Sequence, residues 1–199
     1  MKAIIGRKIG MTRIYNEAGD ALPVTLVVAQ PNTVTQVKTF KKDGYKAVQI
    51  ALSEEKKINK PQTGHLAKAK IKSRNLKEFN LGEENQVGSK INLSSFKKGD
   101  LINVTSISKG KGFAGTVKRH NFHTGPKTHG SDNYRRPGSI GSMYPQRVIK
   151  GRRMAGHLGN KKVTAKNIKI ADMNLENHIL MLNGAVPGPN KGIVYIWSK

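Results

Sequence analysis

The residues best suited to chemistry in this chain are gathered between residues 109 and 162. This stretch contains 13 lysines and arginines, ten glycines and a single acid, Asp132. Its net charge is therefore +12, half of the formal +24 of the whole chain. Lysine and arginine bind phosphate groups, and glycine lets a backbone approach a ligand closely. The stretch predicts binding of a polyanion.

The same stretch is too poor in large aliphatic side chains to fold around a core of its own. Only seven of its residues are Leu, Ile, Val or Phe. So little apolar surface does not offset the conformational entropy of the chain. The stretch is therefore either disordered or ordered by a polyanion. Because the rest of the chain looks able to fold, we expect a nucleic acid to shape it.

The basic residues here alternate with side chains that stack on bases, namely Tyr134, Tyr144, Met143 and Met154. A solvated face is the simpler interpretation of a charge run, and it suffices for Lys41-Lys42 and Lys56-Lys57. In residues 109–162 the joint density of cations, glycines and stacking groups favours RNA.

The sequence argues against a dinucleotide-binding site and against a metal site. Gly110, Gly112 and Gly115 match a dinucleotide-binding fingerprint, but the following forty residues predict neither a crossover helix nor a second parallel strand. His120, His123 and His129 lack the further ligands that a metal site needs. Paired catalytic carboxylates, a nucleophile elbow and a Walker A motif are also missing from the sequence. We expect no enzyme activity, no metal and no cofactor.

Composition narrows the class further. A formal charge of +24 and a pI near 10.4 call for a partner that neutralises them. Nucleic acid is the first choice, and an anionic membrane the weaker one, because no long basic amphipathic helix is predicted. The chain has no cysteine, which excludes disulfides and thiolate sites, and no apolar run that approaches 18 residues. A cytoplasmic protein is the simplest interpretation.

Short strands separated by turns are predicted on both sides of the basic stretch. Lys41 to Gly44 predicts a hairpin turn, and Pro61 opens a short helix that ends near residue 70. Glu54 to Lys60 is expected to be a charged loop. Such a pattern predicts an antiparallel barrel or sandwich. The expected strands are residues 22–28, 33–40, 48–52, 75–81, 101–108, 163–170, 178–182 and 193–197.

Several motifs, in order, resemble the bacterial large-subunit ribosomal protein L3 family over nearly the whole chain. The family's signature is also matched by the single residues Phe96, Asn103, Ser106, Ser108, Gly115 and Arg119. The longer matching motifs are Gly6-Arg7-Lys8-Ile9-Gly10-Met11-Thr12, Gly110-Lys111-Gly112, Gly125-Pro126, His129-Gly130-Ser131, Arg136-Pro137-Gly138-Ser139-Ile140-Gly141, Lys150-Gly151-Arg152-Arg153-Met154-Ala155-Gly156 and Gly184-Ala185-Val186-Pro187-Gly188.

The resemblance implies a mainly β fold: a translation-protein-like antiparallel β-barrel with a small α/β insertion and a long basic irregular extension. The barrel would comprise residues 1–108 plus 160–199, with 54–92 as the inserted subdomain, and the extension residues 109–160. The resemblance also implies direct binding of 23S rRNA, early subunit assembly, and an extension that reaches toward the peptidyl transferase centre.

The expected partners are 23S rRNA and neighbouring large-subunit ribosomal proteins, without a membrane, a small-molecule substrate or a homo-oligomer. Mg²⁺ ions of the rRNA would not be held by a protein site. The predicted tip is Ser142, Met143, Tyr144, Pro145 and Gln146; it lacks the Gln-Asn-Gln-Thr-Pro run in which relatives of the enterobacterial form carry a methylated Gln. The predicted RNA-binding residues are Lys2, Arg7, Lys8, Arg13, Lys109, Lys111, Lys118, Arg119, His120, His123, Lys127, His129, Tyr134, Arg135, Arg136, Arg147, Lys150, Arg152, Arg153, His157, Lys161 and Lys162.

Two rival functions stay open on the residues alone. An RNA-modifying or nucleotide-dependent enzyme that uses the Gly110 region would bind a dinucleotide or methyl donor saturably. An architectural DNA-binding protein would bind duplex DNA as well as it binds rRNA fragments at physiological salt.

Overall fold

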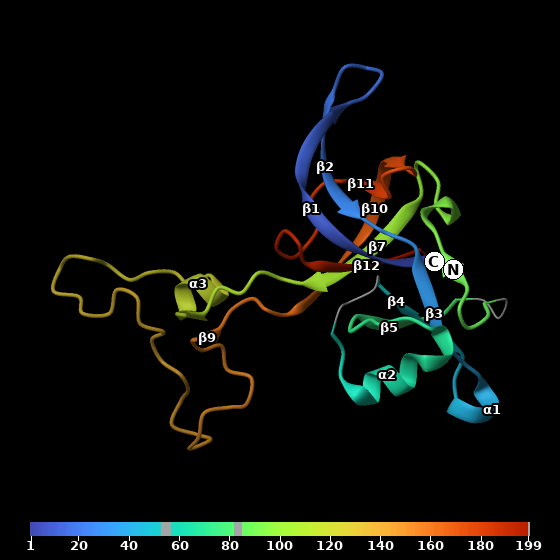
Figure 1. Ribbon diagram of the computed structural model, residues 1–199. Helices are drawn as coiled ribbons and strands as arrows, with labels where there is room; N and C mark the ends of the chain where they lie inside the picture. The colour runs from blue at the N-terminus through green and yellow to red at the C-terminus, as the bar shows by residue number, and fades with distance from the viewer. Residues whose placement is uncertain (53–56, 82–84, 199) are drawn as a thin grey trace. The chain divides into compact units, whose positions relative to one another are not determined.

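The computed structural model describes residues 1–52, 57–81 and 85–198. The chain divides into two compact units (Figure 1): Met1–Ser108 together with Lys162–Lys199, which we call the barrel unit, and Lys109–Lys161, which we call the arm. Residues 54–56 of the expected charged loop lie outside the described residues. None of the helices in the described ranges is long and apolar enough to cross a membrane.

The barrel unit is built on a closed barrel of six strands in the order β1-β12-β7-β10-β11-β2. All of its strand pairs are antiparallel. The mainly β class and the barrel predicted from the sequence are confirmed, and the sandwich alternative is not adopted. The six strands are β1 (Ala3–Tyr15), β2 (Ala21–Val28), β7 (Leu101–Ile107), β10 (Lys162–Asn174), β11 (Ile179–Asn183) and β12 (Ile193–Trp197).

Pairing of the first strand with the last closes the barrel. Ala3 lies opposite Trp197, and the register continues to Arg7 opposite Ile193. The two longest strands carry bulges, between Lys8 and Gly10 in β1 and at two places in β10. Bulges bend a strand and increase its twist, which is what closure of a small barrel requires.

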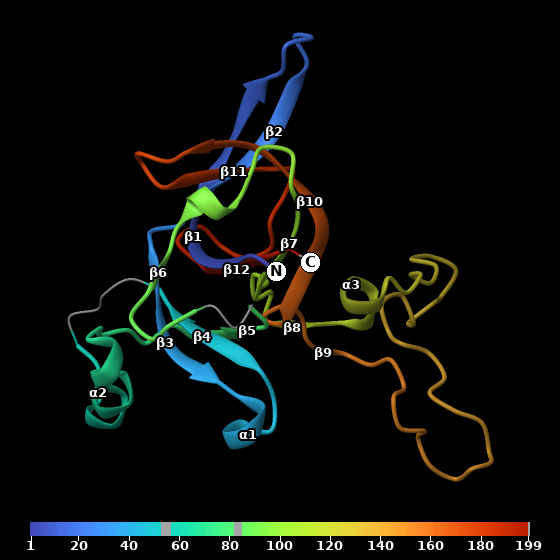
Figure 2. The same cartoon turned by 90° about the vertical axis from the view of Figure 1, so that its right-hand side faces the viewer.

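A second sheet, in the order β5-β4-β3-β6, lies beside the barrel in both views (Figures 1 and 2). It contains β3 (Asn32–Lys38), β4 (Ala47–Ala51), β5 (Leu76–Phe79) and β6 (Lys90–Ile91). The sheet therefore begins at Asn32, well before residue 54, where the inserted subdomain was expected to start. The predicted hairpin between β3 and β4 is present, but its connection is one helical turn, α1 (Phe40–Asp43). Gly44 ends that turn with a φ of 78°.

The remaining helices of the barrel unit are short. The helix predicted after residue 60 is α2 (Lys60–Leu66), continued by a 3-10 turn at Ala67–Ala69. Pro61 stands at its start, where a missing amide hydrogen is tolerated. A second 3-10 turn, Leu93–Ser95, leads into β7. Its Leu93 and the adjacent Phe96 are buried in the barrel core.

Strand β1 is buried on both faces in its first half because it serves two cores. Ile4 packs inside the barrel, with side chains such as Leu180 and Ile196. Ile5 points the other way and packs with residues of the second sheet, among them Ile50. Beyond the bulge, β1 and β2 continue as a ribbon on which Met11 is 52% exposed.

We expect Ile4→Ala and Ile5→Ala each to lower the free energy of unfolding by about 2–5 kcal/mol, because each leaves a cavity in a fully buried site. Met11→Ala is the matched control on the same strand, and its cost should stay below about 0.5 kcal/mol. Urea unfolding followed by circular dichroism measures all three. Equal effects at positions 5 and 11 would contradict the two-core assignment of β1.

Candidate nucleic-acid interface

A two-stranded hairpin holds the two ends of the arm together. It pairs β8 (Phe113–Ala114) with β9 (Gly156–His157). The amide of Lys111 donates to the Leu158 carbonyl (2.8 Å), and the amide of Leu158 donates to Gly112 (2.9 Å). The rings of Phe113 and His157 meet edge to face with centroids 6.2 Å apart. The arm therefore has an ordered base of its own, which we call the neck (residues 109–120 and 154–161).

Two glycines allow the strands of the neck to approach closely. Gly159 has a φ of +76°, and a Cβ there would collide with the carbonyl oxygen of Lys109. A Cβ on Gly156 would lie 2.8 Å from Nη1 of Arg119. A side chain at Gly159 would be excluded both by the backbone conformation and by the space available. Here the glycines serve the protein's own packing.

The helix α3 (Thr116–His120) completes the neck. Nη1 of Arg119 donates to the Met154 carbonyl at 2.6 Å, and Nε2 of His120 lies 3.0 Å from the same oxygen. Arg119 and His120 are thus half-buried and already engaged within the arm. Sequence reasoning assigned both to RNA, took Met154 as a base-stacking side chain and missed Phe113; the short apolar pair Phe113-Ala114 was the available signal.

Residues 121–155 have neither helix nor strand. Local contacts shape them instead: the Gly125 amide donates to Tyr134 (2.9 Å), and Nη2 of Arg152 donates to the Ser139 carbonyl (2.6 Å). Nζ of Lys127 lies 5.1 Å from the ring centroid of Tyr134, a cation–π distance. The irregular extension expected from the sequence is found here, between the two strands of the neck.

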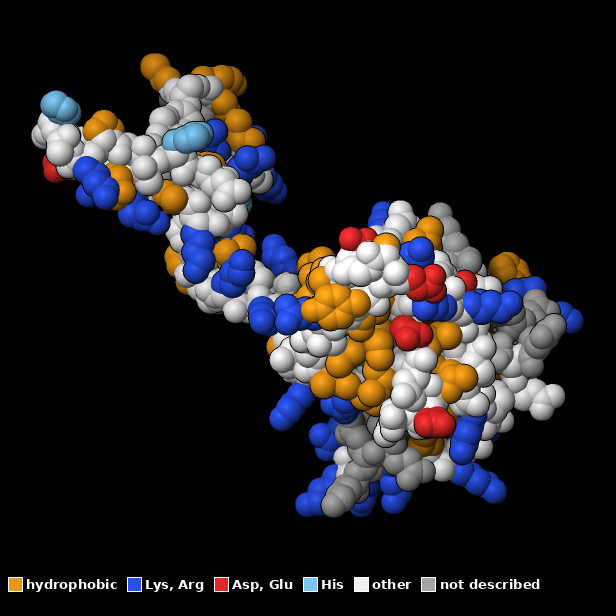
Figure 3. All heavy atoms as spheres, turned by 90° about the horizontal axis from the view of Figure 1, so that it is seen from above, with side chains coloured by type: hydrophobic (Ala, Val, Ile, Leu, Met, Phe, Trp, Pro, Cys, Tyr) orange, Lys and Arg blue, Asp and Glu red, His pale blue; other side chains and the backbone are white. Residues whose placement is uncertain are grey.

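The basic side chains of residues 109–162 are exposed, with the exception of Arg119. Figure 3 shows lysine and arginine side chains along the arm, and it shows one acidic side chain there. Asp132 is the arm's single acid, and it is exposed. Among the described residues, the recorded ion pairs, Lys2–Asp100 and Lys38–Glu78, both lie in the barrel unit. The arm therefore presents a strongly positive surface to the solvent.

The predicted tip combines this charge with exposed apolar side chains. Met143 is 90% exposed and Tyr144 is 84% exposed. Ile140 and Ile149 nearby are also exposed. Large apolar groups on a protein surface usually mark a binding site. In a cationic segment they suit stacking on bases that are not covered by other bases.

The four predicted RNA-binding residues in or just before β1 lie in different environments. Arg7 and Arg13 are exposed on β1. Nζ of Lys2 forms an ion pair with Asp100 (2.8 Å), which holds the pKa of that carboxyl below its usual value. Lys8 is buried, and its Nζ donates to the carbonyls of Val186 (2.8 Å) and Gly188 (3.4 Å). Lys8 fastens the β11–β12 connection, so we leave it out of the interface proposed below.

The structure around the three glycines and the three histidines differs from a dinucleotide site and from a metal site. Gly110, Gly112 and Gly115 lead into a five-residue helix and an antiparallel hairpin, which differs from the parallel unit that binds dinucleotides. Within the described ranges, no three His, Asp or Glu side chains are grouped in a way that would hold a metal ion. His120 instead faces a backbone carbonyl.

These features define a class of protein: a small antiparallel β-barrel with a cationic, glycine-rich arm suited to a polyanion. The family pattern described as "Ribosomal protein L3" matches residues 34–178, which include the whole arm and all of the second sheet except the first two residues of β3. A large ribosomal subunit protein uL3 of Geobacillus sp. (strain WCH70) is 46% identical, with 99% of this chain and 96% of the relative covered. That of Shouchella clausii is 47% identical over 99% and 97%.

The chain belongs to the ribosomal protein L3 family. The resemblance found in the sequence motifs is thereby confirmed. Members of this family are structural ribosomal proteins and not enzymes.

We expect Gly159→Ala to open the neck while leaving the barrel intact, because the new Cβ would collide with backbone atoms of Lys109, which cannot rotate away as a flexible side chain can. Amide hydrogen exchange at Lys111 and Leu158 should accelerate by at least about tenfold. Gly141→Ala is the matched control: it lies in the arm, has no positive φ and has no atom within 4 Å of its Cβ position. Unchanged exchange at both amides in Gly159→Ala would contradict the described packing.

Proposed function

We propose that this chain is a structural constituent of the large ribosomal subunit that binds 23S rRNA directly and takes part early in subunit assembly. The main support is the exposed, almost acid-free positive surface of the arm. The curated relatives are named as proteins of the large ribosomal subunit, which agrees with this partner. As a bacterial ribosomal protein the chain would work in the cytoplasm.

The arm would act by neutralising phosphates that must approach one another in folded rRNA. If about ten of its cations engage phosphates, release of roughly 0.7 counterions per contact makes the affinity fall steeply with salt. Arginine is the better residue where a phosphate is bound by two parallel hydrogen bonds or a base is stacked. The pairs Arg135-Arg136 and Arg152-Arg153 are exposed, and we expect them to serve both uses.

Between the cations, backbone composition favours passage through narrow gaps in RNA. Glycines reduce the width of the chain, and Pro126, Pro137 and Pro145 restrict its freedom before binding. Restriction lowers the entropy that must be lost when the arm becomes ordered on RNA. On the family resemblance, residues 142–150, which contain the tip, would be the part of the arm nearest the peptidyl transferase centre.

The barrel unit would anchor the arm and offer a second RNA contact through Arg7 and Arg13. Neighbouring ribosomal proteins are the other expected partners. A second copy of the chain is a poor partner because each copy carries +24. Mg²⁺ ions would belong to the rRNA, since the exposed cations of the arm repel them.

We expect the double substitution Arg135→Gln, Arg136→Gln to reduce the slope of log affinity against log salt by about 1.4, as two contacts of roughly 0.7 each are lost. Filter binding to 23S rRNA fragments across a series of KCl concentrations measures the slope. Lys41→Gln, Lys42→Gln removes the same charge from exposed residues of the barrel unit and should leave the slope nearly unchanged.

Equal slope changes in the two double variants would mean that only net charge matters and would overturn the assigned interface. Binding of a duplex DNA of equal length with the same affinity would favour the architectural DNA-binding alternative. Saturable binding of a dinucleotide or methyl donor would revive the enzyme alternative.

A further inference from the structure

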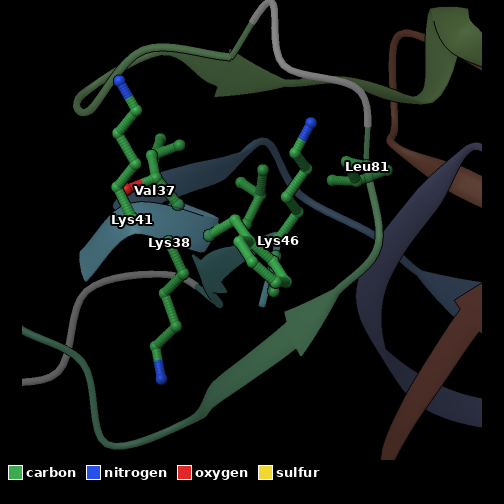
Figure 4. Close-up of a pocket in the computed structure, with 9 residues that line it drawn as sticks. Val37, Lys38, Lys41, Lys46 and Leu81 are labelled. Atoms are coloured by element: carbon green, nitrogen blue, oxygen red, sulfur yellow. The ribbon is translucent and has the colours of Figure 1, made fainter. Parts of the chain in front are cut away.

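The second sheet carries a cleft that the RNA interface does not use. Its volume is about 670 Å³, and it lies where β3 and β4 meet α1. Figure 4 shows its walls as a set of side chains from the sheet and from the segment after β5. The described residues that line it are Val37, Lys38, Thr39, Phe40, Lys41, Lys46, Ala47, Val48 and Leu81.

The floor of the cleft is apolar. Val48 and Ala47 are buried in the sheet, and Val37 and Leu81 are half-buried. Phe40 is 69% exposed although its ring is one of the largest apolar groups in the unit. Burying such a ring under a partner would remove roughly 100 Å² or more of apolar surface from water, which is favourable. The cleft is therefore suited to an apolar side chain.

The rim of the cleft is positively charged. Lys41 and Lys46 extend to one side of it and Lys38 to the other (Figure 4). Lys41 and the adjacent Lys42 are exposed, and no carboxylate of the described residues pairs with them. The positive rim attracts negatively charged groups.

The two described acids nearest the cleft are already bonded to other groups. Glu78 accepts hydrogen bonds from Nζ of Lys38 and from the hydroxyl of Tyr45, both at 2.8 Å. The bond from Lys38 holds the pKa of Glu78 below its usual value, so Glu78 stays ionised. The Asp43 carboxylate accepts the amide of Thr39 at 3.1 Å.

We propose that this cleft binds an acidic segment of another protein, which inserts an aliphatic or aromatic side chain against Phe40 and places carboxylates on Lys41 and Lys42. A nucleotide base fits less well, because Thr39 is the one uncharged polar side chain among the described residues of the lining, and the edge of a base needs several partners. A second copy of the chain is excluded by its charge of +24. The proposal is independent of the RNA interface, which lies on the arm.

The test is a titration of the full chain, labelled at Val and Leu methyl groups, followed by NMR at about 0.15 M salt. The probe is the peptide acetyl-Glu-Glu-Leu-Phe-Glu-Glu-amide. The control peptide replaces Leu-Phe with Ser-Gly and keeps the charge, because any acidic peptide is attracted to the arm. We expect saturable shifts of the Val37, Val48 and Leu81 methyl signals with the probe and none with the control peptide.

Substitutions in the cleft sharpen the test. Phe40→Ala should weaken binding of the probe at least about tenfold, whereas Tyr15→Ala, which removes another exposed aromatic of the barrel unit, should not. Lys41→Gln, Lys42→Gln should weaken it by roughly fivefold, and more at low salt. Both sites are exposed, so the variants should remain folded.

Three results would overturn the proposal: equal methyl shifts with both peptides, no effect of Phe40→Ala, or larger shifts at the cleft with a hexauridylate RNA than with the probe. The last would assign the cleft to RNA. None of them would alter the case for the arm, which rests on the salt dependence of rRNA binding by different residues.

Discussion

Pairing of β7 with β10 is the interaction on which the organisation of the chain depends. Ile107 lies opposite Lys162, so the ladder brings together the two points between which the arm is inserted. Closing a loop of about fifty residues costs roughly 3–4 kcal/mol of chain entropy beyond a constant term. Main-chain bonds of the ladder, the bond between the hydroxyls of Thr105 and Thr164 (2.9 Å) and the barrel core offset that cost. The arm does not have to contribute to folding, and its composition is free to suit a partner.

The arm and the barrel unit differ in how their positive charge is balanced, which follows from the division of the chain into these two units. The arm, residues 109–161, holds 12 lysines and arginines and one acid, a net +11, and the remaining 24 cations and 11 acids leave the barrel unit at +13. In the barrel unit the acids form ion pairs such as Lys2–Asp100. In the arm one acid accompanies 12 lysines and arginines, so a net positive charge is left for solvent or a partner to balance. Mutual repulsion along the arm is relieved when a polyanion binds, which links its ordering to its function.

Sequence periodicity was sufficient for strands such as β11 and β12, in which fully buried and half-buried side chains alternate. The strand expected at 193–197 has those bounds in the structure, and the strand expected at 101–108 ends one residue earlier. The sequence did not show that β3 and β4 pair with β5 and β6 in a sheet separate from the barrel. What distinguishes the two sheets is long-range pairing, such as Asn32 with Ile91, and local pattern does not encode it.

The candidate site was predictable in its charge and less so in its use of single residues. Lys8 looked like a phosphate ligand, yet it is buried and bonded to backbone carbonyls. Arg119 and His120 converge on the Met154 carbonyl, so the cations of the arm have two roles. Arg119 and His120 stabilise the base of the arm, whereas the lysines and arginines between residues 121 and 155 are exposed. A basic side chain beside a glycine in such a chain fits either role, and only its partner across the hairpin distinguishes them.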